Sequence, residues 1–160
     1  MTINELLDLI KLNFIYKEGY LYWAIPKQGR KEKVGNINKD GYTIIVLNGI
    51  WYKAHRLIFL MHNGYLPNQI DHIDGNPNNN KIENLRAASH NQNMQNKGIY
   101  KNNTSGVKGV SFDKNSNKFR VYINMNKKRK YFGRFDDFEL AELVAIEARE
   151  KYHGEFARAA

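Results

Sequence analysis

The chain has 160 residues, a formal net charge of +9 and a pI near 9.6, and it contains no Cys. This length fits one domain or two small ones, and the lack of Cys excludes disulfides, thiolate zinc sites and a cysteine nucleophile. No apolar run is long enough to span a membrane and the first residues lack the features of a signal peptide, so we expect a cytoplasmic protein without a membrane partner. The strongly basic charge predicts a polyanionic partner, most often nucleic acid.

The first half of the chain combines helical and hairpin patterns. Apolar residues at helical spacing predict two short helices, and segments rich in Tyr, Trp, Ile and Val predict a small antiparallel sheet between them. The expected ranges are 3–12 for the first helix, 14–54 for the sheet and 54–64 for the second helix, which Gly64 is placed to end. Turns of the kind that join hairpins interrupt the sheet segments at Glu18-Gly19 and Asn48-Gly49.

Residues 71–85 read DHIDGNPNNNKIENL, a stretch of short polar side chains after the second helix. The pattern that follows, over 81–98, indicates a helix start, a polar turn and a further helix. Apolar residues then become sparse, and Gly, Asn, Ser and Thr dominate around 95–106. We therefore place a linker over 97–104.

The second half is expected to form three strands followed by one amphipathic helix, with strand turns at Lys114–Asn117 and near Asn126–Lys127. Charge separates within this half: residues 97–134 contain eleven Lys or Arg and one Asp, a net +10, whereas residues 136–150 contain six acidic residues and one Arg, a net −5. Alternation along strands places several cations, interleaved with aromatic residues, on one sheet face, as in a face that contacts nucleic acid. The helices and antiparallel sheets together predict the fold class α+β.

Asp71 and His72 are the residues of the polar stretch that best suit phosphodiester hydrolysis. This reaction needs an activated water, a neutralised phosphate and a stabilised leaving oxygen, which one hard cation and one general base can supply. Mg²⁺ prefers oxygen ligands such as carboxylates and amide carbonyls, and an imidazole titrates near neutral pH. In an extended segment the two side chains point to opposite faces, so Asp71 can face a metal while His72 faces the attacking water.

The segment DHIDGNPNNNKIENLRAASHNQNMQN resembles the HNH nuclease motif, in the zinc-free form of phage and intron-encoded endonucleases. Together with the preceding GYTIIVLNGIWYKAHRLIFLMHNGYLP, the resemblance covers about residues 34–96, and it implies a ββα-metal fold over about 69–96. It implies that His72 is the general base and that Asn84 braces the loop. It also implies that Asp71 and Asn93 bind one divalent ion, Mg²⁺ or Mn²⁺.

Other residues near this motif have less defined roles. His90 and Asn96 are the alternatives to Asn93 as the second metal ligand, because they lie within one helical turn of it. Asp74 and the Asn residues at 78–80 are expected to form the turn between the two strands. His55 is expected either to touch phosphate or support the site, or to start the second helix, and His62 is expected to be structural.

The second half resembles the APETALA (ethylene-response-factor, AP2/ERF) type of DNA-binding domain over about residues 104–158, through GVKGVSFD, KFRVYI, KYFGRFDDFELA and YHGEFA. The resemblance implies that a three-stranded sheet enters the major groove of double-stranded DNA with a helix packed behind it. The expected domains are a nuclease domain over 1–96, the linker and a DNA-binding domain over 105–160. The candidate DNA contacts are Arg56, Arg86, Lys108, Lys118, Arg120, Lys128, Arg129, Lys130 and Arg134.

Taken together, these features predict a metal-dependent HNH endonuclease of the homing type that nicks double-stranded DNA and leaves a 5′-phosphate. One site per chain predicts a monomer or a weak dimer, acting in the host cytoplasm if a phage encodes it. The alternative is a non-catalytic DNA-binding regulator with a degenerate nuclease unit. An RNA nuclease fits less well, because the second half resembles a reader of duplex DNA.

Overall fold

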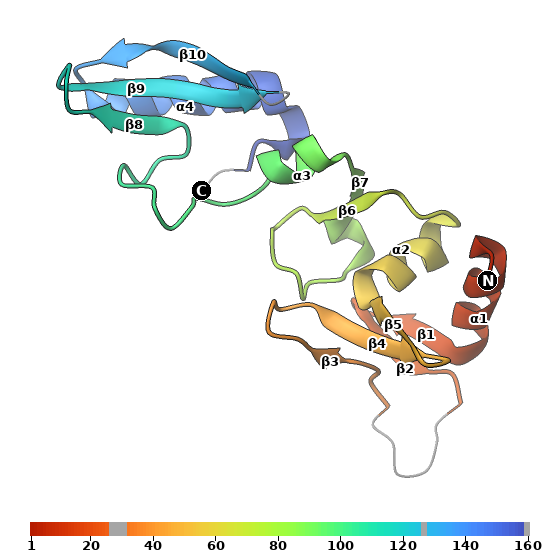
Figure 1. Cartoon of the computed structure of the whole chain (residues 1–160). Coiled ribbons are helices and arrows are strands. Elements are labelled where there is room, and N and C mark those ends of the chain that lie inside the picture. The colour runs from red at the N-terminus through yellow and green to blue at the C-terminus, as the bar shows by residue number, and fades with distance from the viewer. Residues whose placement is uncertain (26–31, 126–127, 159–160) are drawn as a thin grey trace. The chain divides into compact units, whose positions relative to one another are not determined.

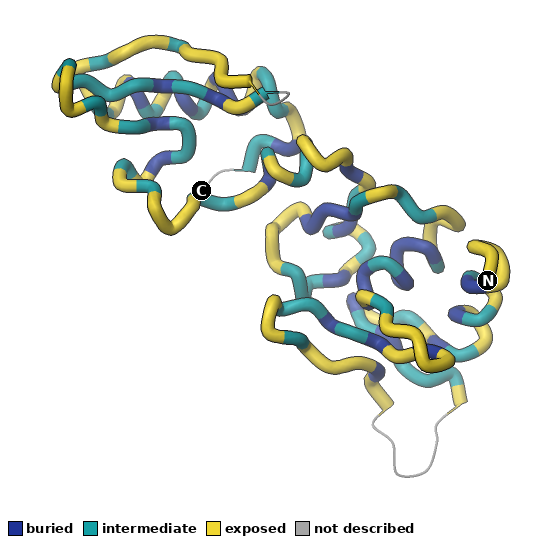
Figure 2. The backbone as a smooth tube through the Cα atoms, viewed as in Figure 1, coloured by how far each residue is buried: buried dark blue, intermediate teal, exposed yellow. Residues whose placement is uncertain are grey.

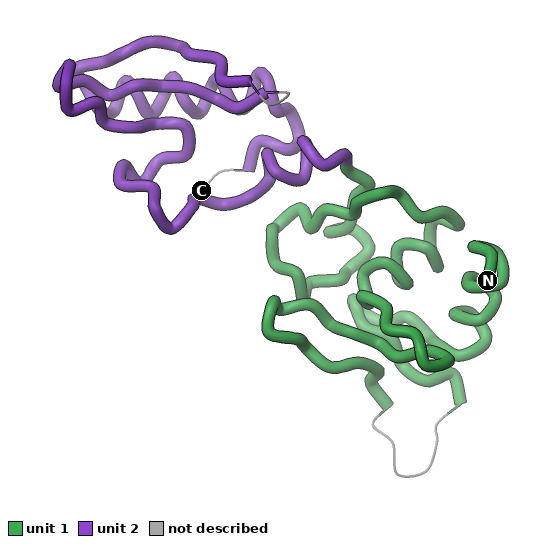
Figure 3. Tube along the Cα trace, viewed as in Figure 1, with its two compact units in different colours: residues 1–88 green, residues 89–160 purple. Residues whose placement is uncertain are grey.

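The computed structural model describes residues 1–25, 32–125 and 128–158, which form helices and several small antiparallel sheets (Figure 1). This mixture confirms the predicted class α+β. The chain divides into two compact units, residues 1–88 and 89–160 (Figure 3). None of the helices within the described ranges has both the length and the apolar character needed to cross a membrane.

The first unit alternates short helices with hairpins. Its elements are α1 (Ile3–Asn13), β1 (Phe14–Lys17), β2 (Tyr20–Trp23), β3 (Asn36–Ile37), β4 (Thr43–Leu47), β5 (Ile50–Lys53), α2 (Ala54–Asn63), β6 (Gln69–His72), a 3₁₀ turn (Ile82–Asn84) and β7 (Leu85–Ala88).

Both predicted helices of this unit are confirmed, and local chemistry explains where they begin and end. A capping box starts α1: the Thr2 side chain accepts from the backbone N–H of Glu5, and the Glu5 side chain accepts from the backbone N–H of Thr2. Gly64 ends α2 with a φ of 73°, a left-handed conformation that favours glycine.

Both predicted hairpin turns are also confirmed, since Glu18, Gly19, Asn48 and Gly49 all have positive φ, as a two-residue type I′ turn requires. The expectation of one sheet over 14–54 is wrong. The strands form a two-stranded sheet, β1–β2, and a separate three-stranded sheet, β3–β4–β5. Among the described residues, a single isolated bridge, Tyr22 to Lys33, pairs backbone between these two segments, which is too little to merge the sheets.

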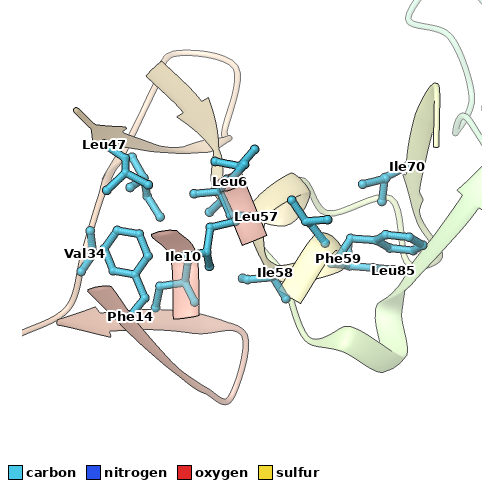
Figure 4. Packing of buried hydrophobic residues seen from close by; sticks show 14 residues of the cluster. Leu6, Ile10, Phe14, Val34, Leu47, Leu57, Ile58, Phe59, Ile70 and Leu85 are labelled. Atoms are coloured by element: carbon cyan, nitrogen blue, oxygen red, sulfur yellow. The ribbon is translucent and has the colours of Figure 1, made fainter. Parts of the chain in front are cut away.

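A hydrophobic core holds the first unit together and fixes the β6–β7 hairpin. Ile10 and Phe14 pack with α2 residues at its centre, and Ile70 of β6 and Leu85 of β7 join the same cluster beside Phe59 (Figure 4). Burying one such side chain contributes about 1.5–3 kcal/mol. The core therefore positions the strand that carries the polar stretch.

The segment after the polar stretch differs from the pattern-based expectation of a helix start and a polar turn. Residues Leu85–Ala88 form β7, which pairs antiparallel with β6, with Asp71 opposite Arg86 and His72 opposite Leu85. Leu85 and Ala88 are buried. Pairing with a strand from elsewhere in the chain and burial of these apolar side chains together explain why the segment is extended.

The second unit consists of α3 (His90–Gln95), β8 (Val110–Asp113), β9 (Lys118–Met125), β10 (Lys128–Phe135), α4 (Phe138–His153) and a 3₁₀ turn (Gly154–Phe156). The sheet order is β10–β9–β8, so the prediction of three strands followed by one helix is confirmed. The predicted strand turn near Asn126–Lys127 lies outside the described residues.

Small side chains let α4 pack closely on one face of this sheet. Ala141 and Ala145 are completely buried against Val110 and Val121. Asp137 caps the helix, because its side chain accepts from the backbone N–H of Glu139. The outer strand β10 is exposed along most of its length (Figure 2).

The two units meet between Ala88 and Ser89, earlier in the chain than the expected end of the nuclease domain at residue 96. Helix α3 and the expected linker over 97–104 both belong to the second unit. One cause is Lys108, whose ammonium group donates to the backbone carbonyls of Gln95 and Lys97 and so ties α3 to the start of the sheet region.

Candidate active site and nucleic-acid interface

Asp71 and His72 occupy the last two positions of β6, and both are buried, with 3% and 6% of their surface exposed. The core anchors the strand through Ile70, directly before them. Their side chains contact different partners, as the alternation of an extended strand requires. Asp71 pairs with a residue of β7, and His72 faces the loop and the β4–α2 region.

Arg86 binds Asp71 across the hairpin. Its Nε and Nη2 atoms lie 2.9 and 2.8 Å from the same oxygen, Oδ2 of Asp71, and the Arg86 side chain is only 13% exposed. The guanidinium therefore neutralises the carboxylate and fixes its orientation. Arg86 lies among the expected DNA contacts, so any contact with phosphate would come from a group already bound to Asp71.

His72 lies in a cluster of ring systems and one buried amide. Its Nε2 atom is 3.0 Å from Oδ1 of Asn80, which is 2% exposed. The His55 ring meets the His72 ring edge to face, with centroids 5.0 Å apart, and the Tyr42 ring lies 6.2 Å away. The sequence placed Asn80 among the turn-formers, and the structure adds this direct contact with the imidazole.

His55 is also buried, at the start of α2. Burial, with further contributions from His72, Lys53 and Arg56, lowers its pKa from 6.5 to about 3. The ring is therefore neutral at physiological pH. Its position against His72 and Tyr42 favours the supporting role over a contact with phosphate.

Asn84 joins the two ends of the loop between β6 and β7. Its Nδ2 donates to Oδ1 of Asp74 and to the carbonyl of Asn79, at 2.9 and 2.8 Å, and its Oδ1 accepts from the backbone N–H of Asp74 at 3.0 Å. The backbone N–H of Ile73 donates to the Asn84 carbonyl. These bonds close the loop over which the polar residues are spread.

The other polar side chains of this loop are also used within the protein. Burial acts to raise the pKa of the Asp74 carboxyl, but hydrogen bonds from Asn79, Asn76 and Asn84 outweigh it and hold the pKa below its usual value. The Thr43 hydroxyl donates to Oδ1 of Asn78 at 2.8 Å, which ties the loop to β4.

Asn93 lies in α3, in the second unit, together with its alternative His90, and Asn96 caps the same helix. Ser89 begins the helix directly after β7 with a capping box. The Ser89 side chain accepts from the backbone N–H of Gln92, and the Gln92 side chain accepts from the backbone N–H of Ser89. The chain order β6, β7, α3 is thus that of a ββα motif. The pairing of Asn93 with Asp71 in one metal site stays a prediction.

Within the described residues, no three His, Cys, Asp or Glu side chains cluster as a metal site. A site built from Asp71 and an Asn amide would hold fewer protein ligands than such a cluster. Both donors are oxygens, which suits a hard cation that keeps several waters or phosphate oxygens, as Mg²⁺ does. The donor chemistry therefore fits the expected ion.

The register of the second sheet separates the candidate DNA contacts by face. Residues directly opposite each other on paired strands share a face, and Arg120 is opposite Arg134. The face away from α4, here called the open face, carries Ser111, Asp113, Lys118, Arg120, Tyr122, Asn124, Arg129, Tyr131 and Arg134. Four of the expected cations lie there together with two exposed or half-exposed tyrosines.

Contacts among these side chains order the open face. Arg129 stacks over the Tyr122 ring, 4.6 Å from its centroid, and Tyr131 lies beside that ring. The guanidinium groups of Arg120 and Arg134 each lie 3.8 Å from Asp113. Both remain more than a third exposed, which leaves them accessible to a ligand on this face.

Three expected DNA contacts lie elsewhere. Lys130 is on the helix side, opposite the buried Ile123, and donates to the Tyr152 hydroxyl at 2.8 Å. Lys128 shares that side, and the ammonium group of Lys108 is bound to backbone carbonyls. These three cations are therefore not part of the open face.

Three further residues of the sequence analysis make contacts of their own within the protein. Arg56 is half-buried in α2 and lies 3.5 Å from the Pro67 carbonyl. Lys118 pairs with Asp136 at 3.0 Å, at the edge of the open face. His62 is exposed, its Nδ1 is 2.8 Å from the Ile58 carbonyl, and it meets the Tyr16 ring edge to face, which agrees with a structural role.

Comparison with known proteins gives two matches. Residues 52–95, from β5 to the end of α3, match the protein family described as HNH endonuclease. The chain is 37% identical over 113 residues to Protein 3.8 of Escherichia phage T7, in a match that covers 68% of this chain and 93% of that protein. No solved structure matches the chain. The chain therefore belongs to the same family as phage T7 Protein 3.8 and contains an HNH endonuclease domain at residues 52–95.

Proposed function

We propose that the chain is a metal-dependent endonuclease that hydrolyses phosphodiester bonds in double-stranded DNA. The observation that carries this proposal is the buried pair Asp71 and His72 at the end of β6, inside the segment that matches HNH endonucleases. His72 takes a proton from a water molecule, and the resulting hydroxide attacks phosphorus in line with the leaving 3′ oxygen. The products are a 5′-phosphate and a 3′-hydroxyl.

In this proposal the carboxylate of Asp71 and the amide oxygen of Asn93 would hold one divalent ion, with His90 and Asn96 as the alternatives to Asn93. Arg86 fixes the carboxylate through Oδ2. When bound, Mg²⁺ or Mn²⁺ would neutralise charge at the phosphate and stabilise the departing oxygen. Asn84 serves as the brace that keeps the loop beside His72 closed.

The second unit is proposed to bind the DNA duplex through its open face, as an AP2/ERF-like domain over 105–160 attached to a nuclease domain over 1–96. What supports this is the gathering of Arg120, Arg129 and Arg134 with two tyrosines on one accessible sheet face. The guanidinium group of Arg can donate hydrogen bonds both to guanine edges and to phosphate oxygens. Because each chain has one proposed site, a monomer or a weak dimer would nick the DNA, as homing-type enzymes do. If a phage encodes the protein, the reaction would take place in the cytoplasm of the host cell.

A non-catalytic DNA-binding regulator is the second candidate. The observation in its favour is that Arg86 already neutralises Asp71, the only carboxylate of the proposed metal site. The buried environment of His72 weighs against it, because a regulator has no need for an imidazole held between an amide and a second ring.

A supercoiled plasmid separates these two candidates. Incubated with the protein and Mg²⁺, it should become nicked, EDTA should stop the reaction, and DNA ligase should reseal the nick, since sealing requires a 5′-phosphate beside a 3′-hydroxyl. Asp71→Asn should bind the plasmid and fail to nick it. If neither phage nor host DNA is nicked in an EDTA-sensitive way, the regulator is the better account.

A further inference from the structure

Asn80 is a buried polar residue for which the proposed function names no role. Its Oδ1 lies 3.0 Å from Nε2 of His72, and its Nδ2 is buried without a hydrogen-bond partner within the described residues. A buried donor without a partner is unfavourable, and an apolar side chain of the same shape would avoid that cost. The stability of the fold therefore does not explain why an amide occupies this position.

We propose that Asn80 is a positioning residue that holds His72 as a single tautomer, with the proton on Nε2 and the lone pair on Nδ1. An amide oxygen can only accept, so its bond to His72 requires a proton on Nε2. In the neutral ring the other nitrogen, Nδ1, is then the base that takes the proton from water. This step rests on the proposed function of His72.

The β1–β2 hairpin supports the backbone of Asn80. Gly19, at φ +83°, lies so close that a Cβ there would meet the Lys81 nitrogen at 2.8 Å and the Asn80 carbonyl carbon at 3.1 Å. The Tyr16 hydroxyl accepts from the backbone N–H of Ile82 at 3.0 Å. A turn that precedes Asn80 by some sixty residues therefore helps to hold the amide against the imidazole.

His55 and Tyr42 complete the setting by packing against the ring of His72. A ring contact of this kind does not fix which nitrogen carries the proton, whereas a hydrogen bond to one nitrogen does. The geometry thus assigns separate tasks: the rings hold the imidazole in place, and the Asn80 oxygen determines which nitrogen carries the proton.

The direct test is the tautomer of His72 in the 160-residue chain without DNA or metal. Long-range ¹H–¹⁵N NMR spectra of the imidazoles distinguish the two tautomers, and His72→Gln identifies the His72 signals. At a pH where the ring is neutral, the wild type should show the Nε2–H form. A wild-type ring protonated on Nδ1 would mean that the amide donates instead of accepts, and the proposal would be wrong.

Two substitutions separate positioning from folding. Asn80→Leu keeps the side-chain shape, removes the acceptor and the unsatisfied donor, and should give a mixture of tautomers. Asn80→Asp keeps an acceptor and should retain the Nε2–H form. Asn78→Ala is the matched control, because that side chain bonds to Thr43 and not to His72, and its spectrum should match the wild type.

Single-turnover nicking gives the second readout. Asn80→Leu should slow the reaction about 10- to 100-fold with unchanged DNA affinity, the size of effect typical of residues that orient a functional imidazole. A variant with the wild-type tautomer and rate would overturn the proposal. If the wild type nicks no DNA, the proposed function fails, while the tautomer still decides whether Asn80 positions the ring.

Discussion

His55 makes the stability of the first unit dependent on pH, with a sign and size that follow from its burial. Its pKa is about 3 in the folded protein, against 6.5 in an exposed chain. As the pH falls below 6.5, the unfolded state takes up a proton that the folded state does not accept until about pH 3. The free energy of unfolding therefore falls as the pH is lowered from 6.5 to about 3. The contribution of the neutral His55 ring to stability is complete only above pH 6.5.

Between pH 7 and pH 5 this linkage amounts to about 2 kcal/mol, since each pH unit below the unfolded pKa contributes about 1.4 kcal/mol. The assay is urea unfolding followed by tryptophan fluorescence. Trp23 and Trp51, the only two tryptophans of the chain, both lie in the first unit, so the signal reports on that unit alone.

His55→Gln is the comparison, because Gln cannot titrate at this position. Other groups titrate equally in both proteins, so the quantity to compare is the loss of stability from pH 7 to pH 5 in each. The wild type should lose about 2 kcal/mol more than His55→Gln. Equal losses in the two proteins would refute the neutral, desolvated state of the His55 ring.

Three further predictions concern other parts of the molecule. Asn84→Ala removes the bonds that close the β6–β7 loop and should lower the unfolding free energy of the first unit by about 1 to 3 kcal/mol in the same fluorescence assay; an unchanged value would contradict its role as a brace. Gly109→Ala should destabilise the second unit by roughly 1 to 3 kcal/mol, because Gly109 has a φ of +90° and a Cβ there would lie 2.7 Å from the Tyr122 carbonyl oxygen. Hydrogen exchange of the β9 amides measures this, and Gly98→Ala, where a Cβ meets nothing within 4 Å, should show no change. Replacing Arg120, Arg129 and Arg134 by Gln should make DNA binding less dependent on salt. The slope of the logarithm of the binding constant against the logarithm of the salt concentration should become less steep by about 0.9 for each lost phosphate contact. The double variant Lys128→Gln, Lys130→Gln, on the other face, should leave this slope nearly unchanged. A smaller slope in the lysine variant and an unchanged slope in the arginine variant would mean that DNA binds on the helix side of the sheet.

Local patterns predicted those parts of the fold that depend on neighbouring residues. Asn48-Gly49 marks a turn because both residues tolerate positive φ, and the apolar spacing of α1 and α2 is visible in the sequence itself. The division into two sheets and the strand Leu85–Ala88 depend on pairing with distant residues. Those pairings leave no local signal, which is why the sequence pattern favoured one sheet and a helix start.

Some residues of the candidate site could likewise be predicted from the sequence, and others could not. Asp71 and His72 could be selected from their chemistry and from the HNH resemblance. Asn80 could not be separated from Asn78 and Asn79, which have the same side chain, because only its burial beside His72 distinguishes it.

The cations of the second unit were selected by charge alone. Which of them share a face depends on strand register, and the register places Lys130 beside the helix and Arg129 on the open face. The sequence could therefore predict a basic sheet but not which of its cations lie on the open face.

The most direct test of the central claim compares His72→Ala with His62→Gln in single-turnover nicking of a plasmid with Mg²⁺. His62 is an exposed histidine of the same unit that contacts Tyr16 and the Ile58 carbonyl, so it controls for the loss of an imidazole. His72→Ala should bind DNA with wild-type affinity and nick it roughly 100-fold or more slowly, whereas His62→Gln should nick at the wild-type rate. Nicking by His72→Ala at the wild-type rate would contradict the assignment of His72 as the general base.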